Sequence, residues 1–455
     1  MRPFGIRDQV GYMFGDMGGS FVYIYVDAYF MTFCTYALGI HPFFMGTLFL
    51  CIRLLEACYA PIVGSIPDRR ALGHSGDKFK PYIKAAMLPL ALAGICCFSG
   101  SAGWNPAFKH LWVIFCYVFY GLAYSFAAIP YGSMASVISG SPEDRTKLSR
   151  ARSIGGSLVN FGALSLVPLA VFDEGNEVRG RMFLLLAVIF GACSLVSYQI
   201  LLRNTEERIR RPRSEQPFRL GRVVGEALRN RPLIGAMTAT IGSLILLTGQ
   251  AQFGAYFYKE YYGAPRMLSV VNLATLPITA LLFLIVPRLS ARLGKRNLLL
   301  GAGGMSLAVS LFLFLVPLSN VWHFFMLNLL AALGNNVFSM LVWALVCDCI
   351  DYQEITTGER SDGSIYSIFA FARKLGATAA SALASYGLGW IGFVSGAAQQ
   401  TPEVARNIRM LYTAIPLVAS LLIVAGIGLV YNLSQADTER ISQELEKRHE
   451  GRVAG

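Results

Sequence analysis

Long apolar runs recur along the whole chain and constrain its fold more than any other feature. Apolar stretches such as 87–99, 183–202 and 417–431 are separated by short polar loops. A helix of about 20 residues spans a bilayer, so we expect such runs to be membrane helices. With 55% hydrophobic and 15% charged residues, the chain has more apolar surface than a soluble core can bury. The surplus must face lipid.

The apolar runs predict an all-α membrane protein with twelve transmembrane helices in two six-helix halves. A β-barrel would need segments of about ten residues with alternating polarity, and the sequence lacks that pattern. The expected spans are 9–37, 43–66, 83–102, 110–138, 152–172, 181–203, 232–258, 267–288, 297–318, 321–350, 364–393 and 407–432.

The longest polar interruption follows the sixth span and divides the chain into two parts. We predict an N-terminal half at 1–203, a cytoplasmic linker at 204–231, a C-terminal half at 232–433 and a cytoplasmic tail at 434–455. Many secondary transporters are built from such repeats, with the substrate bound near the midplane between them.

The net charge of +12 is placed mainly on one side of the predicted helices. Basic residues follow the even-numbered spans, for example Lys80, Lys147 and Arg292, whereas most loops after odd-numbered spans are neutral or acidic. By the positive-inside rule both termini are cytoplasmic, in a bacterial inner membrane. This placement fits anchoring in lipid, and we expect no nucleic-acid partner. The exceptions to the pattern are Arg179, Arg181, Lys259, Arg406 and Arg409.

The residues that usually carry catalysis or bind metals form no recognisable set. Most of the nine cysteines lie inside apolar spans, where they act as small hydrophobic residues. Cys347 and Cys349 flank Asp348, but no histidine accompanies them. We therefore expect no enzyme activity, no bound metal and no cofactor.

Several short motifs are spread over nearly the whole chain. They are Gly15-Asp16, Gly76-Asp77-Lys78-Phe79-Lys80-Pro81, Ile129-Pro130-Tyr131-Gly132-Ser133, Asp144-Arg145-Thr146 with Arg152, and the string from Asp348 through Asp351, Tyr352, Glu354, Thr357 and Gly358 to Arg360. With these motifs the chain resembles the glycoside-pentoside-hexuronide cation symporters of the major facilitator superfamily. The resemblance implies the major facilitator fold, alternating access, and a monomer that carries a small glycoside across a lipid membrane.

The resemblance also implies roles for individual residues. Glu56 matches the first acid of the family's cation site, Ser125 matches its hydroxyl ligand, and Lys374 matches its central lysine. The family's second cation-site acid falls on Ala60, and the neighbouring asparagine falls on Tyr59. The implied cation-coupling set is therefore Glu56, Ser125 and Lys374.

Charges within the predicted spans point to the same residues. An ion in the bilayer needs a partner or a function. Glu56 lies in the middle of the second span, one helical turn after Arg53. We hypothesise an ion pair between Glu56 and Lys374 across a central cavity, coupled to the transport cycle. A purely structural tie between the halves is the alternative.

The candidate ligands favour a proton as the coupling ion. Sodium requires several hard oxygen ligands, and Glu56 with Ser125 is a poor set, whereas a proton needs a single carboxylate. Sodium coupling, uncoupled facilitation and transport of a non-sugar solute such as a lipid remain open.

A polar stripe on the first span is a candidate sugar-binding surface. Its members are Asp16, Ser20, Tyr23 and Asp27, which recur every three to four residues and therefore share one helix face. Alternatively, Asp16 packs near the cytoplasmic end and Asp27 faces periplasmic water. The basic residues Arg152, Lys374 and Arg53 favour an anionic glycoside such as a hexuronide. The full substrate-binding prediction comprises Ser20, Tyr23, Asp27, Tyr120, Tyr124, Arg152 and Lys374.

Opposite charges at the predicted cytoplasmic helix ends are candidates for a gate. One exposed ion pair contributes under about 1 kcal/mol, so we interpret them as a network that biases two conformations. A solvated surface is the alternative for each pair taken alone. The predicted gate residues are Asp68, Arg69, Asp144, Arg145, Asp351 and Arg360.

Overall fold

The protein is helical throughout the part of the chain that the structure describes. The computed structural model describes residues 2–69, 72, 77–139, 141–209, 230–357, 362–397 and 399–453. Within these ranges the only β contact is an isolated antiparallel bridge between Phe172 and Val178. The predicted all-α class is confirmed.

Among the described residues up to 209, the chain forms seven α-helices and three short π or 3₁₀ turns. They are α1 (Ile6–Thr32), η1 (Phe33–Ala37), α2 (Pro42–Arg69), α3 (Lys80–Cys97), α4 (Pro106–Ile138), α5 (Pro142–Ser157), η2 (Leu158–Gly162), η3 (Ala163–Ser165), α6 (Leu166–Val171) and α7 (Gly180–Asn204). The second part comprises α9 (Arg231–Glu260), α10 (Met267–Leu293), α11 (Lys295–Leu315), α12 (Val321–Thr357), α13 (Asp362–Trp390), α14 (Pro402–Ala425), η4 (Gly426–Val430) and α15 (Gln435–Val453).

Helices lie over all twelve predicted spans. Among the described residues, ten helical spans are long and apolar enough to cross a membrane. The helices over 9–37 and 364–393, α1 and α13, are not among these ten. Charged side chains such as Asp16, Asp27 and Lys374 lower the hydropathy of these two helices, and two of them, Asp27 and Lys374, are among the predicted site residues.

Proline marks the start of several helices for a simple reason. Pro42, Pro106, Pro142 and Pro402 are the first residues of α2, α4, α5 and α14. Proline lacks the backbone N–H that would be unpaired there, and its fixed φ suits the first helical turn. The turn from α10 into α11 is a single residue, Gly294, whose φ of 79° favours glycine.

The fifth span differs from its prediction. Instead of one regular helix over 152–172, α5 begins at Pro142 and ends at Ser157, and the π and 3₁₀ turns η2 and η3 connect it to α6.

Glycines let α5 approach α1 closely. An added Cβ at Gly155 would lie 2.5 Å from the carbonyl oxygen of Met13, and one at Gly156 would lie 2.8 Å from Oδ2 of Asp16.

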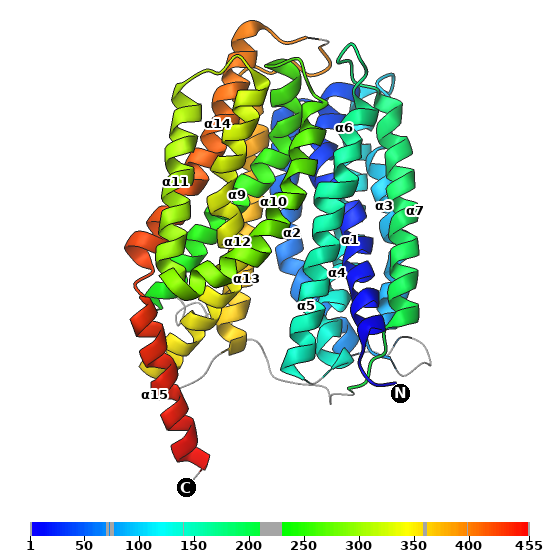
Figure 1. The fold of residues 1–455 in the computed structure, drawn as a ribbon. Coiled ribbons are helices and arrows are strands. Elements are labelled where there is room, and N and C mark those ends of the chain that lie inside the picture. Colours follow the sequence, from blue (N-terminus) through cyan, green and yellow to red (C-terminus); the bar gives the residue numbers. More distant parts are fainter. Residues whose placement is uncertain are drawn as a thin grey trace. The chain divides into compact units, whose positions relative to one another are not determined.

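Contacts group the chain into two compact units that do not coincide with the predicted halves. Unit 1 contains residues 1–216, 251–276 and 381–405, and unit 2 contains 217–250, 277–380 and 406–455. Within unit 1, α1 packs against α3, α4, α5 and α7 (Figure 1). The division at 203 and 231 stays a prediction.

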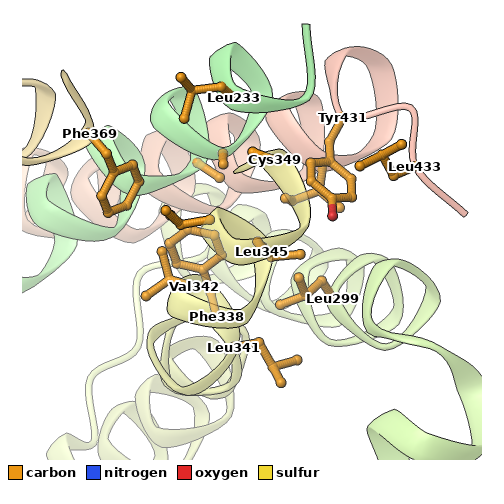
Figure 2. Packing of buried hydrophobic residues seen from close by; sticks show 14 of the residues in the cluster. Leu233, Leu299, Phe338, Leu341, Val342, Leu345, Cys349, Phe369, Tyr431 and Leu433 are labelled. Atoms are coloured by element: carbon orange, nitrogen blue, oxygen red, sulfur yellow. The ribbon is translucent and has the colours of Figure 1, made fainter. Parts of the chain in front are cut away.

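Unit 2 has an apolar core around α12. Phe338, Leu345 and Cys349 of this helix pack with Leu299 of α11 and Leu233 of α9 (Figure 2). All five are buried. Beside this core, Nζ of Lys295 lies 2.6 Å from both carboxylate oxygens of Asp348, and the Tyr431 hydroxyl donates to Asp348 at 3.2 Å. Asp348, the first acid of the motif that runs from Asp348 to Arg360, is thus paired with Lys295 inside unit 2.

The segment after α7 is fixed against unit 1. The carboxylate of Glu207 accepts backbone N–H bonds from Lys78, Phe79 and Lys80, at 2.6, 2.9 and 2.8 Å, where α3 begins. These N–H groups have no partner inside the helix, so the carboxylate caps α3. The beginning of the predicted linker is therefore part of the fold.

The predicted tail is helical from Gln435, and its first turn is capped. The Ser434 hydroxyl and backbone N–H donate to Asp437 at 2.7 and 3.0 Å, and the backbone N–H of Asp437 donates back to the hydroxyl at 3.2 Å. These hydrogen bonds from Ser434 lower the pKa of Asp437. The arrangement is a capping box.

Glu207→Ala is expected to destabilise the protein. It removes one charged acceptor from three N–H groups, and losing hydrogen bonds to a charged group costs about 2 kcal/mol. We expect a lower midpoint of thermal unfolding for the purified protein. The neighbouring acid Glu206, whose side chain is 41% exposed and, among the described residues, accepts only one backbone N–H bond, from Arg2, is the matched control, and Glu206→Ala should lower the midpoint less. Equal midpoints for the two variants would contradict the capping role.

Candidate functional site

A cluster of three charged residues joins α1 to α2. Nη2 of Arg53 lies 2.8 Å from Oδ1 of Asp27, and Nη1 lies 3.3 Å from Oε2 of Glu56. The side chains of Arg53, Asp27 and Glu56 are only 15, 16 and 10% exposed. Arg53 and Glu56 share a face of α2 because they are three residues apart. Asp27 comes from the neighbouring helix.

Glu56 also contacts α4 at a glycine. A Cβ added to Gly121 would lie 2.6 Å from Oε1 of Glu56 and 3.3 Å from the hydroxyl of Tyr59. Ser125, the predicted hydroxyl ligand, is buried one turn further along α4. The structure therefore places Glu56 and Ser125 at the same pair of helices, with Gly121 making room for the carboxylate.

Tyrosines surround the charged cluster. The ring of Tyr23 stacks on Tyr124 with centroids 5.0 Å apart, and Tyr124 stacks on Tyr120 at 6.0 Å. The guanidinium of Arg53 lies 6.0 Å from the Tyr23 ring. Among the described residues, the buried hydroxyl of Tyr120 has no hydrogen-bond partner. Buried hydroxyls normally have one, so this hydroxyl is a candidate to bind water or a ligand.

At the end of the polar stripe on α1 that lies away from Asp27, Asp16 pairs with a second arginine, Arg152 of α5. Nε of Arg152 donates to Oδ1 of Asp16 at 2.9 Å, and the Ser20 hydroxyl donates to Oδ2 at 3.3 Å. Arg152 also lies 5.3 Å from the ring of Tyr131, which stacks on Tyr12. The Arg152 side chain is 49% exposed, so this pair is more open than the one at Arg53.

Lys374 lies on α13 in unit 2, where its carbonyl oxygen accepts a hydrogen bond from the Thr378 hydroxyl at 2.8 Å. Glu56 belongs to unit 1. An ion pair between Glu56 and Lys374 would join the two units, and it stays a prediction.

The gate residues are described in part. Asp144 accepts a hydrogen bond from the Ser139 hydroxyl at 2.8 Å and pairs with Lys147 at 3.5 Å, and Arg145 donates to the carbonyl of Ser139 at 3.0 Å. These contacts tie the end of α4 to the start of α5. Asp351 lies on α12. Arg360 and the side chains of Asp68 and Arg69 lie outside the described residues. The gate network stays a prediction.

Sequence reasoning missed a buried ion pair at the end of α9, where the loop after the seventh predicted span begins. Lys259 and Glu260, adjacent at the end of α9, lie 2.7 Å apart with side chains 6 and 5% exposed. The Tyr36 hydroxyl of η1 donates to Oε1 of Glu260 at 2.7 Å, and Nζ of Lys259 lies 4.8 Å from the Tyr36 ring. Lys259 was an exception to the charge pattern, and its partner Glu260 explains why it is tolerated.

Further hydrogen bonds in unit 1 continue this contact. We call this set of bonds between the first half of the chain and residues 256–266 and 395–400 the loop seam. The bonds join the hydroxyls of Thr35 and Tyr256 at 2.6 Å, Gly396 N–H to the Thr35 carbonyl at 3.0 Å, the Ser395 hydroxyl to the Ile40 carbonyl at 2.9 Å, and the Asn176 amide to the Gly263 carbonyl at 2.6 Å. At this end η1, the loop after it and the loop before α7 are bonded to the end of α9 and to the loops after α9 and α13.

The described chain is similar to known membrane carriers over nearly its full length. A family model described as MFS/sugar transport protein matches residues 11–435. The "Uncharacterized symporter YjmB" of Bacillus subtilis is 31% identical over 98% of this chain and 96% of its own length. The "Glucuronide carrier protein homolog" of Escherichia coli is 26% identical over 97% and 96%.

Solved structures show the same fold at low identity. A bacterial homologue of the human lysosomal transporter Spinster, in an inward-facing and unoccupied conformation, matches with a TM-score of 0.64 and 12% identity, over 96% of this chain and 97% of that one. The fold expected from the sequence is thereby confirmed. The chain belongs to the MFS/sugar transport protein family, and it is a membrane transporter rather than an enzyme.

Proposed function

We propose that the protein is a proton-coupled symporter of a glycoside or hexuronide that works by alternating access. The observation that carries this proposal is the buried Arg53 cluster beside the stacked tyrosines. It supplies an acid, Glu56, for the coupling ion and aromatic faces for a sugar ring. In this proposal the protein acts as a monomer in the bacterial inner membrane with both termini cytoplasmic.

The geometry around Glu56 supports a proton over sodium. Glu56 and Asp27 both contact the guanidinium of Arg53, at 3.3 and 2.8 Å. A sodium ion would need several oxygen ligands around it, and a guanidinium in the same cluster would repel it. A proton needs only one carboxylate oxygen.

The second arginine supports an anionic substrate. Half of the Arg152 side chain is exposed, and its neighbours include aromatic rings. Guanidinium groups match carboxylates in geometry and charge. One relative carries glucuronide in its name. Ser20, Tyr23, Tyr120 and Tyr124 complete the proposed binding surface.

Alternating access needs two ends that close in turn. The loop seam supports a closed end at the odd-numbered loops. The predicted gate residues Asp68, Arg69, Asp144, Arg145, Asp351 and Arg360 are proposed to close the cytoplasmic end.

Glu56→Gln is expected to abolish concentrative uptake. Proteoliposomes would be tested with neutral glycosides and hexuronides under imposed proton or sodium gradients. A gradient of one pH unit is worth about 1.4 kcal/mol per proton and should drive roughly tenfold accumulation in the wild type. The variant should reach only equal concentrations on both sides, because an amide cannot carry the proton.

Glu174→Gln, which changes an exposed acid in an odd-numbered loop, is the matched control and should keep accumulation. Sodium-driven uptake would contradict the choice of ion. Gradient-independent equilibration in the wild type would make the protein a uniporter, and competition by lipids rather than sugars would overturn the substrate class.

Lys374→Ala is expected to impair coupled uptake, since the proposed partner of Glu56 is removed. Two residues that form a pair show non-additive effects. The double variant Glu56→Gln/Lys374→Ala should therefore be no worse than Glu56→Gln alone. Arg406→Ala, an exposed cation of the same half, is the control. Unchanged uptake and expression in Lys374→Ala would show that the coupling hypothesis is wrong.

Arg152→Gln should separate charged from neutral substrates. We expect the KM for hexuronides to rise about tenfold or more, since a charge-assisted hydrogen bond contributes about 1.5–3 kcal/mol. The KM for a neutral glycoside should change little. The double variant Arg152→Gln/Asp16→Asn controls for the carboxylate left unpaired. Equal losses for both substrate classes in both variants would contradict an anion-binding role.

A further inference from the structure

Asp27 is engaged differently from the other predicted sugar ligands. Its carboxylate contacts Nη2 of Arg53 at 2.8 Å, while the neighbouring Nη1 contacts Glu56 at 3.3 Å. The guanidinium carries five N–H donors in a rigid fork, so one arginine can serve two acids at once. Two carboxylates from two helices therefore share one cation.

The two contacts are unequal. Asp27 makes the shorter one, whereas Glu56 approaches Arg53 with Oε2 and places Oε1 against Gly121 of α4. A protonated Glu56 would lose its ionic attraction to Arg53. Asp27 would still hold the guanidinium in place. The arrangement keeps Arg53 positioned in both protonation states of Glu56.

We propose that Asp27 is a positioning residue of the ion-coupling site, where it competes with Glu56 for Arg53 and thereby sets how readily Glu56 takes up a proton. The inference rests on the proposed function, in which Glu56 carries the coupled proton. It moves Asp27 from the sugar-binding surface to the coupling site. It also supplies a second acid from α1, at a site where the sequence has Ala60 at the position of the family's second acid.

Other ionisable groups near the cluster keep their charge state around neutral pH. Tyr23 of α1, Tyr59 of α2 and the α4 residues Tyr117, Tyr120 and Tyr124 lie within electrostatic range of it. Tyrosines ordinarily ionise near pH 10, well above the range in which a transport assay is run. Lys374, the predicted partner of Glu56, is left unchanged in every variant below.

The direction of the effect follows from two contributions of the same sign. Removing the charge of Asp27 ends its competition for Arg53, so the attraction between Arg53 and Glu56 strengthens and favours ionised Glu56. It also removes a like charge, which favours ionised Glu56 again. A higher proton concentration is then needed to protonate Glu56.

The test is the pH dependence of uptake by Asp27→Asn in proteoliposomes. We expect the pH of half-maximal uptake to fall by about one unit, which is roughly a tenfold higher proton concentration. The KM for sugar at saturating proton concentration should stay unchanged. Asp27→Glu, which keeps the charge, should restore the wild-type profile, and Glu174→Gln is the surface control. Asp27→Ser removes the same charge if the Asn variant does not fold.

A sugar KM that rises at every pH, with an unchanged pH midpoint, would overturn the proposal and return Asp27 to the sugar site. A second readout separates this proposal from the proposed function. The infrared C=O band of protonated Glu56, identified by its absence in Glu56→Gln, reports protonation without transport. A band midpoint that shifts to lower pH in Asp27→Asn supports the link even if wild-type uptake ignores the proton gradient, whereas an unshifted midpoint overturns it.

Discussion

A charge enclosed among membrane helices must have a partner, and in unit 1 this requirement organises α1. Three carboxylates lie along that helix, and each binds an arginine from a different segment. Asp8 pairs with Arg208 at 3.0 Å, Asp16 with Arg152 at 2.9 Å, and Asp27 with Arg53 at 2.8 Å. These pairs tie α1 to the segment after α7, to α5 and to α2. Unpaired ions would cost several kcal/mol each in this setting, so the three pairings also fix which elements can surround the helix.

The three pairs differ in exposure, and this difference suggests a division of labour. The Asp8 side chain is 1% exposed, and its two arginine partners also bond to backbone carbonyls, so this pair anchors the chain. The arginine of the Asp16 pair is half exposed and therefore open to a solute. The Asp27 pair is enclosed but shares its arginine with Glu56, so its strength depends on the protonation of another group. The same carboxylate–arginine pairing thus occurs once as an enclosed anchor, once at an exposed arginine and once at an enclosed arginine shared by two acids.

The helices were predictable because lipid imposes a length and a polarity that can be read along the chain. The second span, predicted at 43–66, is the helix Pro42–Arg69. The π and 3₁₀ turns within the fifth span were not predictable from apolar periodicity, and neither was the close approach of Gly155 and Gly156 to α1, which depends on another helix. The same limit applies to the site. Arg53 and Glu56 share a face of one helix, and their contact follows from spacing alone. The contact of Arg53 with Asp27 depends on where the tertiary fold places α2 relative to α1, and the cap of α3 by Glu207 depends on how the chain returns after α7.

The loop seam is held by polar contacts and the core of unit 2 by apolar contacts, so the free-energy cost of separating them in water differs. The seam consists of hydrogen bonds, since Lys259 and Glu260 are neighbours on α9 and their ion pair does not cross it. Polar groups regain hydration when they are exposed, so breaking each of these hydrogen bonds in water costs only about 1 kcal/mol net. The core around Phe338 and Leu345 has no such compensation, because exposing apolar area costs about 25 cal/mol per Å². The seam can therefore part in water at a lower free-energy cost than the apolar core of unit 2, and the proposed alternating access requires this contrast.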